Sequence, residues 1–194
     1  MPPPTGSVVL PLRERIVVAA STLTTTEGWS AVTMARLADE VGVSRQTVYN
    51  EIGGKPALAE AMTLHELDRF LTVVRGAFDT HADDVVEAIR AASRACLERA
   101  QDNRLLHAVV SATHGADTEL LPLLTTHAES LLAVAKEVIA ERLRPFDLGL
   151  DGRQLDAAID MVVRVVLSHV MQPSATPAQT ADDIAWIAAR VLRR

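Results

Sequence analysis

Hydrophobic residues recur at intervals of three and four along nearly the whole chain, which is the spacing of one face of an α-helix. The first stripe, from Ile16 to Leu23, predicts a helix over residues 12–27 that ends at Gly28. No segment alternates hydrophobic and polar residues as a half-buried strand does. The pattern therefore predicts an all-α protein of roughly nine or ten helices.

Three more helices follow closely. Thr33 and Ser44 are residue types that cap helix N-termini, and they predict two short helices over residues 34–41 and 45–52. A Gly-Gly pair then interrupts the chain, and a Lys-Pro pair opens a long helix over about residues 55–78. Proline is tolerated in that first turn because its missing N–H would have no helical partner there.

The rest of the chain continues the helical pattern. Asp151 with Gln154 resembles a capping box, and Thr176 followed by Pro177 is a second strong helix start. In the last helix, Trp186 lies away from the stripe that we expect to face inward. That stripe comprises Ile184, Ile187, Ala188 and Val191, and the predicted helices of this part cover residues 83–100, 103–111, 119–124, 126–143, 151–171 and 176–192.

The two short helices are predicted to form a helix-turn-helix motif. Ala38 is small, so a second helix can cross close to it, and Gly42 can adopt the positive φ that a sharp turn between helices requires. Val48 then packs the second helix against hydrophobic residues of the first. The remaining face of the second helix is free to enter a groove of DNA.

The face opposite Val48 carries Gln46 and Asn50, because successive residues of a helix are rotated by about 100°. Amide side chains pair well with adenine, and Arg45 could pair with guanine. The other reading is a polar face that only meets water, as on most surface helices. We favour DNA binding by Thr33, Ser44, Arg45, Gln46, Thr47, Tyr49, Asn50 and Lys55, with the residues that do not read bases holding phosphates.

The segment VTMARLADEVGVSRQTVYNEIGGKPAL, residues 32–58, follows a Glu-Gly-Trp at residues 27–29. Together they resemble the DNA-binding domain of the TetR family of bacterial transcriptional regulators, with a specific resemblance over about residues 12–60. Beyond that, only the number and order of helices are similar. The positions that match the end of the family's pattern are Tyr49, Lys55 and Leu58.

Two positions depart from that pattern, and the resemblance also implies a division of the chain. Glu51 stands where an aromatic residue or His is usual, and Ile52 stands where Phe is usual. The implied organisation is a flexible tail over residues 1–11, a helix-turn-helix domain over 12–54 and a helical ligand-binding and dimerisation domain over 55–194. The resemblance further implies a homodimer joined through about residues 151–192, although these helices could also be simply core. A two-fold dimer would bind a palindromic operator, because one helix-turn-helix alone contacts too little DNA to select a site.

Composition narrows the class of protein. Hydrophobic residues make up 48% of the chain and aromatic residues 3%, so a large aliphatic core is possible. The net charge of −6 permits only a local DNA-binding surface. A single cysteine, Cys96, excludes an internal disulfide, and no hydrophobic run is long enough to span a membrane. We therefore expect a cytoplasmic protein that needs no cofactor.

Candidate chemical sites are few. The six histidines are not spaced as metal ligands, and no sequence motif of a nucleophile or nucleotide site occurs, so neither a metal site nor an enzyme is expected. The mid-chain residues Arg90, Arg94, Arg99 and Arg104 have the spacing of solvated faces. Mid-chain histidines and Ser111 could orient a ligand in an apolar cavity. The simpler reading is that the histidines are exposed and that the hydrophobic candidates are ordinary core residues. The candidate pocket residues are Met62, Phe70, Phe78, His107, Ser111, His114 and His127.

Two functions are therefore weighed. The first is a dimeric DNA-binding regulator, a repressor that a small apolar effector releases from its operator. The second is an adaptor or architectural DNA-binding protein whose C-terminal domain binds another protein. Stabilisation by small ligands in a thermal-shift screen would favour the first.

Overall fold

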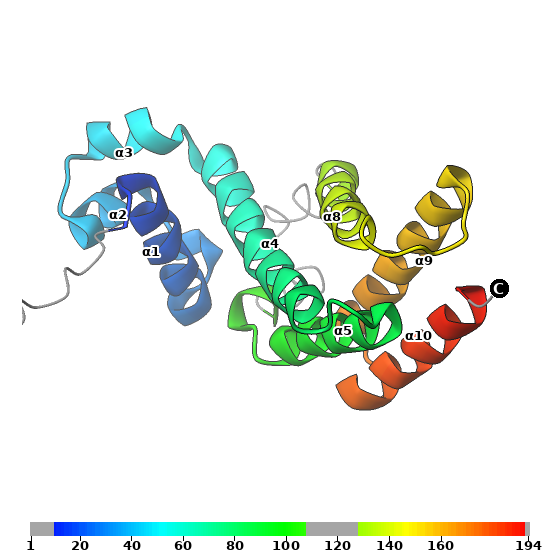
Figure 1. Cartoon of the computed structure of the whole chain (residues 1–194). Coiled ribbons are helices and arrows are strands. Elements are labelled where there is room, and N and C mark those ends of the chain that lie inside the picture. Colours follow the sequence, from blue (N-terminus) through cyan, green and yellow to red (C-terminus); the bar gives the residue numbers. More distant parts are fainter. Residues whose placement is uncertain (1–9, 108–127, 193–194) are drawn as a thin grey trace, which may run out of the picture. The chain divides into compact units, whose positions relative to one another are not determined.

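The computed structural model describes residues 10–107 and 128–192, and every element in these residues is a helix, as predicted (Figure 1). The α-helices are α1 (Leu12–Glu27), α2 (Met34–Val41), α3 (Arg45–Ile52), α4 (Lys55–Thr80), α5 (Val85–Gln101), α8 (Ala128–Leu143), α9 (Gly152–Met171) and α10 (Pro177–Val191), with a 3-10 turn, η1 (Trp29–Ala31), after α1.

Most helix starts follow the capping residues that the sequence suggested. Thr33, Ser44 and Thr176 each accept a hydrogen bond from a backbone N–H of the first turn, and Asp151 forms a reciprocal capping box with Gln154. The largest difference is at α5, which begins later than predicted because Asp84 caps it. The predicted helix over 119–124, and most of the one over 103–111, lies outside the described residues.

The chain divides into two compact units, residues 1–65 and 66–194. The division falls inside α4, later than the boundary after residue 54 that the sequence suggested. In the first unit, α1 packs against both α2 and α3. Its centre is tightly filled, since Ile16, Leu37 and Val48 have no exposed surface.

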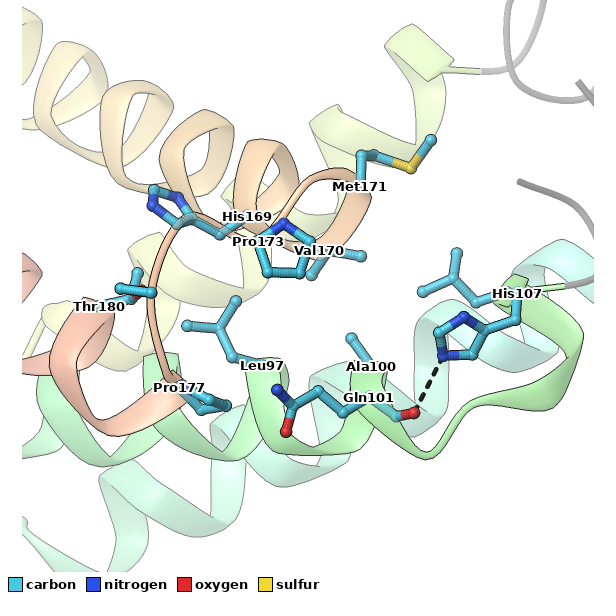
Figure 2. A pocket seen from close by; sticks show the side chains of 12 residues that line it. Leu97, Ala100, Gln101, His107, His169, Val170, Met171, Pro173, Pro177 and Thr180 are labelled. Carbon is cyan, nitrogen blue, oxygen red and sulfur yellow. Dashed lines mark hydrogen bonds between the residues drawn. The ribbon is translucent and has the colours of Figure 1, made fainter. Parts of the chain in front are cut away.

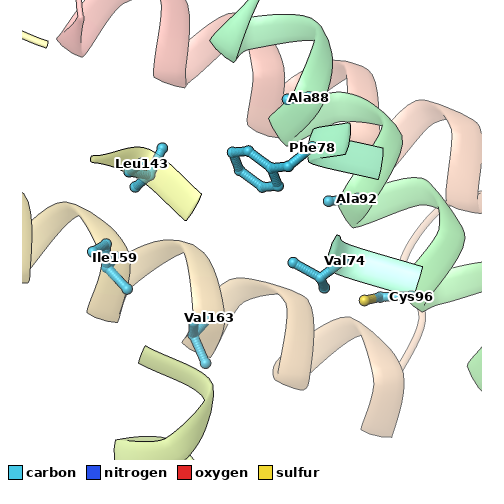
Figure 3. Close-up of a cluster of buried hydrophobic side chains, with 8 residues drawn as sticks. All are labelled: Val74, Phe78, Ala88, Ala92, Cys96, Leu143, Ile159 and Val163. Atoms are coloured by element: carbon cyan, nitrogen blue, oxygen red, sulfur yellow. The ribbon is translucent and has the colours of Figure 1, made fainter. Parts of the chain in front are cut away.

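The second unit has its core where α4, α5, α8 and α9 approach one another (Figure 3). Phe78 is its largest buried side chain, and its ring meets that of Phe146 edge to face at a centroid separation of 6.3 Å. α10 packs along α5 (Figure 1) with small buried residues such as Ala181 and Ala185, which allow two helices to approach closely. The buried cluster comprises Val74, Phe78, Ala88, Ala92, Cys96, Leu143, Ile159 and Val163.

The inward stripe predicted for α10 is half wrong. Ile184 and Ala188 are buried, but Ile187 and Val191 are 53% and 49% exposed. They are exposed because α5 covers α10 on one side only, through a narrow line of mostly small residues. Trp186 lies away from the core, as predicted, with 61% of its surface exposed.

Candidate nucleic-acid interface and effector cavity

The turn between α2 and α3 has the geometry of a helix-turn-helix. Gly42 ends α2 in the left-handed region, with φ 72° and ψ 42°, where a side chain would be strained. The N–H of Val43 donates to the carbonyl oxygen of Ala38 at 3.0 Å, which closes the turn. Ser44 then caps α3 by accepting from the N–H of Thr47 at 3.1 Å. The chain therefore reverses within a few residues and sets α3 against α2.

The orientation predicted for α3 is confirmed. Val48 is fully buried, whereas Gln46 and Asn50 are exposed on the other side of the helix. The two amides are paired, because Gln46 Nε2 donates to Asn50 Oδ1 at 2.9 Å. Arg45 lies over the ring of Tyr49, with its guanidinium carbon 5.5 Å from the ring centroid. The side chains that the sequence assigned to bases and to phosphates thus share one exposed face of α3.

Contacts from α1 and η1 hold this face in place. Arg15 Nη2 donates to the carbonyl oxygen of Val41 at 2.5 Å, and Arg13 Nη1 donates to that of Glu51 at 2.7 Å. These are carbonyls at helix C-termini, which have no partner within their own helix. Lys55 Nζ lies 4.9 Å from the ring centroid of Trp29, so its position at the start of α4 is also fixed.

The hydroxyl groups assigned to DNA have structural roles in the free protein. Thr33 Oγ1 accepts from the N–H of Arg36 at 3.2 Å, and Ser44 Oγ lies 2.8 Å from Thr47 Oγ1. Thr33 and Ser44 set the starts of α2 and α3. The side chains that combine exposure with unused hydrogen-bonding capacity are those of Arg45, Gln46, Tyr49 and Asn50.

An apolar cavity of about 210 Å³ lies in the second unit, between α4, α5, α8 and α9. No charged side chain lines it among the described residues, and Ser93 supplies the one hydroxyl. Burial raises the pKa of the Cys96 thiol in its wall to about 12, so the thiol is neutral and inert at ordinary pH. Such a cavity suits an apolar molecule and offers nothing to a sugar or a nucleotide.

The structure brings only some of the predicted pocket residues together. Phe70 and Phe78 line the apolar cavity, whereas Met62 is buried in the first unit and does not line it. Ser111, His114 and His127 lie outside the described residues. Most of the wall was not predicted from the sequence, because its residues are ordinary core positions. Examples on three different helices are Leu71, Val74, Ala92, Val163 and Val166.

His107 lines a second cavity, of about 240 Å³, between the end of α5 and the loop that joins α9 to α10 (Figure 2). Its Nε2 lies 2.9 Å from the carbonyl oxygen of Gln101, a contact drawn in Figure 2. His169 stands on another part of the same wall. The two cavities share Leu106 and Val170, and together they fall within the range of roughly 300–1,000 Å³ that is typical of small-molecule sites.

A third hollow, of about 610 Å³, is a largely hydrophobic groove between α9 and α10. Met161 of α9, 63% exposed, and Ile187 and Val191 of α10 line it. Monomeric surfaces seldom keep such hydrophobic residues together in water. Most of its lining residues belong to the segment predicted to form the dimer contact, residues 151–192.

Neither a metal-binding cluster nor a membrane-spanning helix is found among residues 10–107 and 128–192. No three His, Cys, Asp or Glu side chains are grouped so that they could hold a metal ion. No helix in these ranges is both long and apolar enough to cross a bilayer.

Sequence models of two protein domains match the chain. Residues 16–62 match the one described as bacterial regulatory proteins, tetR family, and residues 84–190 match the C-terminal domain of the bacterial tetracyclin repressor. The first match covers the helix-turn-helix and the start of α4. The second covers the helices α5 to α10, which include most of the apolar cavity.

Individual relatives agree with these matches. The HTH-type transcriptional regulator AlkX of Mycobacterium tuberculosis is 27% identical over 174 residues, which is 90% of this chain and 82% of the relative. The crystal structure of the TetR family repressor AlkX from Dietzia sp. strain DQ12-45-1b, implicated in biodegradation of n-alkanes, is 28% identical with a TM-score of 0.74, covering 92% of this chain and 96% of the other. Thermus thermophilus FadR, a TetR family repressor solved with lauroyl-CoA, is 22% identical with a TM-score of 0.59 over 93% and 92%, and it supports the fold alone.

Proposed function

This chain belongs to the TetR family of bacterial regulatory proteins, and from this premise we propose that it is a dimeric repressor released from a palindromic operator by a small apolar effector. Its family assignment makes it a transcriptional regulator with a DNA-binding N-terminal domain and a ligand-binding C-terminal domain. Members of the family bind DNA operators, dimerise and bind small molecules, and the relatives found are regulators rather than enzymes.

The apolar cavity is the observation that carries the choice of effector. Its wall lacks charged groups among the described residues, so a strongly polar ligand would lose its hydration there without regaining hydrogen bonds. The AlkX repressor from Dietzia, which is implicated in biodegradation of n-alkanes, supports the same class of molecule. A long aliphatic molecule, or a ring with few polar groups, fits this environment.

DNA reading is assigned to α3. In the proposed complex, Gln46 and Asn50 exchange their mutual hydrogen bond for contacts with base edges, and Arg45 pairs with a guanine. Thr47, Tyr49 and Lys55 hold phosphates and fix the register, with Thr33 and Ser44 at the helix starts beside them. Glu51 is exposed on the same helix and adds no phosphate contact.

Dimerisation is assigned to the exposed hydrophobic groove of α9 and α10. One reading helix contacts too few base pairs to select a site in a genome, and a two-fold dimer doubles the contact with a palindrome. Half-sites one helical turn apart fix the separation of the two α3 helices at about 34–36 Å. An effector that displaces α4, the helix that begins with Lys55, would change that separation and weaken binding.

The alternative, an adaptor whose C-terminal domain binds another protein, is not favoured. The C-terminal match is to a domain of a ligand-responsive repressor, and the cavity lies inside the helices rather than on a flat surface. An adaptor would need no such internal space.

Fluorescence anisotropy of a labelled operator tests the proposal. We expect n-alkanes, primary alcohols or fatty acids to release the full-length protein from the DNA, and to raise its melting temperature without DNA. Sugars and nucleotides should do neither. Release by polar metabolites, with no response to any apolar compound, would overturn the effector class while leaving the family assignment intact.

A further inference from the structure

Arg99 of α5 lies beside the apolar cavity and is paired with Glu66 of α4. Its Nη2 donates to Glu66 Oε1 at 3.2 Å, and its guanidinium carbon lies 5.5 Å from the ring centroid of Phe70, a residue of the cavity wall. The side chains of Arg99 and Glu66 are only 25% and 15% exposed. The sequence suggested a solvated arginine at this position, so the partial burial is a finding of the fold.

The carboxylate of Glu66 has two further hydrogen-bond donors near it besides Arg99. Asn103 Nδ2 donates to Glu66 Oε1 at 2.6 Å, and Arg69 Nη1 lies 3.5 Å from Glu66 Oε2. Asn103 Oδ1 in turn accepts from the N–H of Leu106 at 2.9 Å, and Leu106 lines the cavity. The cluster is therefore connected to the cavity wall through both Phe70 and Leu106.

Arg99, in contrast, has a hydrogen-bond donor without an acceptor among the described residues. Its Nε is buried and has no hydrogen-bond acceptor among the residues that the structure describes. A guanidinium normally binds a carboxylate through two parallel N–H bonds, and the edge that carries Nε and Nη2 has this geometry. Here Glu66 takes only Nη2. A buried donor without a partner is uncommon and costs stability. We therefore expect a bound ligand to supply the acceptor for Arg99 Nε.

We propose that Arg99 receives the terminal carboxylate of the effector, whose hydrocarbon part occupies the apolar cavity, and that this carboxylate displaces Glu66. The inference rests on the proposed apolar effector and narrows it to a hydrophobic carboxylic acid. The exchange forms no covalent bond and conserves charge at the guanidinium, since one carboxylate replaces another. Glu66, once displaced, keeps Asn103 and Arg69 as hydrogen-bonding partners.

The exchange of carboxylates also allows the effector to alter the contacts of α4. Glu66 is a residue of this helix, and the helix is continuous from Lys55 to Thr80. Loss of the Glu66–Arg99 ion pair removes one of the contacts that join α4 to α5, whereas an uncharged hydrocarbon in the cavity leaves this contact intact. A carboxylic acid should therefore release DNA more effectively than an alkane or alcohol of equal length.

Calorimetric titration of the full-length protein with dodecanoate, 1-dodecanol and dodecane tests the assignment. Because a charge-assisted pair is worth more than a neutral contact, we expect dodecanoate to bind at least about tenfold more tightly than 1-dodecanol. Arg99→Gln should abolish this preference and leave 1-dodecanol binding unchanged. Glu66→Gln should strengthen dodecanoate binding several-fold, because the competing carboxylate is gone.

Arg94→Gln is the matched control, since it removes the same charge from an exposed i,i+4 pair with Glu98 on the same helix. It should leave all three affinities unchanged. If Arg99→Gln does not fold, Arg99→Lys keeps the charge without the two-pronged geometry and should still reduce the preference. Equal binding of dodecanoate and 1-dodecanol by the native protein would overturn the carboxylate site alone. Failure of all three probes to bind would overturn the apolar effector as well.

Discussion

The exposed surfaces of α3 and of α9 with α10 are opposite in character. On α3 the exposed residues are polar, with Gln46 and Asn50 in water and Val48 buried beneath them. On α9 and α10 an exposed groove is lined mainly by hydrophobic residues, and Met161 and Ile187 of this groove are 63% and 53% exposed. A polar face is stable in water by itself, whereas a hydrophobic groove of this kind is usually covered by a partner. This difference supports the proposal that the first surface binds DNA and that the second contacts another copy of the chain.

The interiors of the two units differ as well. The first unit buries Ile16, Leu37 and Val48 completely, as a small rigid support for α3 requires. The second unit keeps a cavity of about 210 Å³ beside its core. Unfilled space between helices weakens their packing, and it leaves room for a ligand to alter their positions. This contrast supports the proposed division between a tightly packed unit that binds DNA and a less tightly packed unit that binds an effector.

The largest expected effect comes from breaking the hydrophobic groove. Met161→Glu with Ile187→Glu places two charges in the proposed dimer contact without disturbing the core, because both side chains are exposed. We expect a folded monomer, seen by light scattering, with operator affinity reduced on the order of a thousandfold or more, toward the non-specific level.

Val18→Glu is the control for that variant, since Val18 on α1 is 41% exposed and lies far from α9 and α10 in the sequence. It should remain a dimer. If the double variant also remains a dimer, the contact between copies lies elsewhere and the contrast between the two surfaces loses its explanation.

The next effect concerns base reading by α3. Gln46→Ala should cost roughly 1–3 kcal/mol at the native operator, because a base edge loses its amide partner, and it should relax the preference at one base position. Anisotropy with a set of single-base operator variants measures both quantities. An equal loss for every variant would mean that Gln46 binds the backbone rather than a base.

Helix capping allows a direct comparison of the two units. Ser44→Ala and Thr176→Ala each remove a cap from the first turn of a helix, and each should lower the free energy of unfolding by about 1 kcal/mol in chemical denaturation. Only Ser44→Ala should also weaken operator binding, since it loosens α3. A similar loss of DNA affinity in Thr176→Ala would show that the reading helix depends on the second unit.

The smallest effect is expected at Lys55. Lys55→Ala should weaken binding to all DNA sequences alike and reduce the slope of log affinity against log salt by about one, because one phosphate contact is lost. Titrations at several salt concentrations measure the slope. A change that depends on operator sequence would assign Lys55 to a base instead.

The helix-turn-helix of α2 and α3 was predictable from the sequence because the residues that determine it are close to one another along the chain. Thr33 and Ser44 cap helices through atoms only three residues away, and Gly42 is required by its own backbone angle. The burial of Val48 follows from the helical period alone. The starts of α9 and α10 were predictable for the same reason, because Asp151 and Thr176 cap the helices that directly follow them. These features needed no knowledge of how distant segments pack.

The sequence by itself determined the all-α class, the helix-turn-helix and the helix caps, since each depends on residues within a turn or two of one another. Only the tertiary structure decided which hydrophobic residues stay exposed and which line a cavity. The periodicity of α10 could not reveal that Ile187 lacks a cover, nor could that of α4 place Met62 outside the cavity. The pairing of Glu66 with Arg99 joins residues 33 positions apart, and packing between helices, rather than any pattern along one helix, brings such groups together.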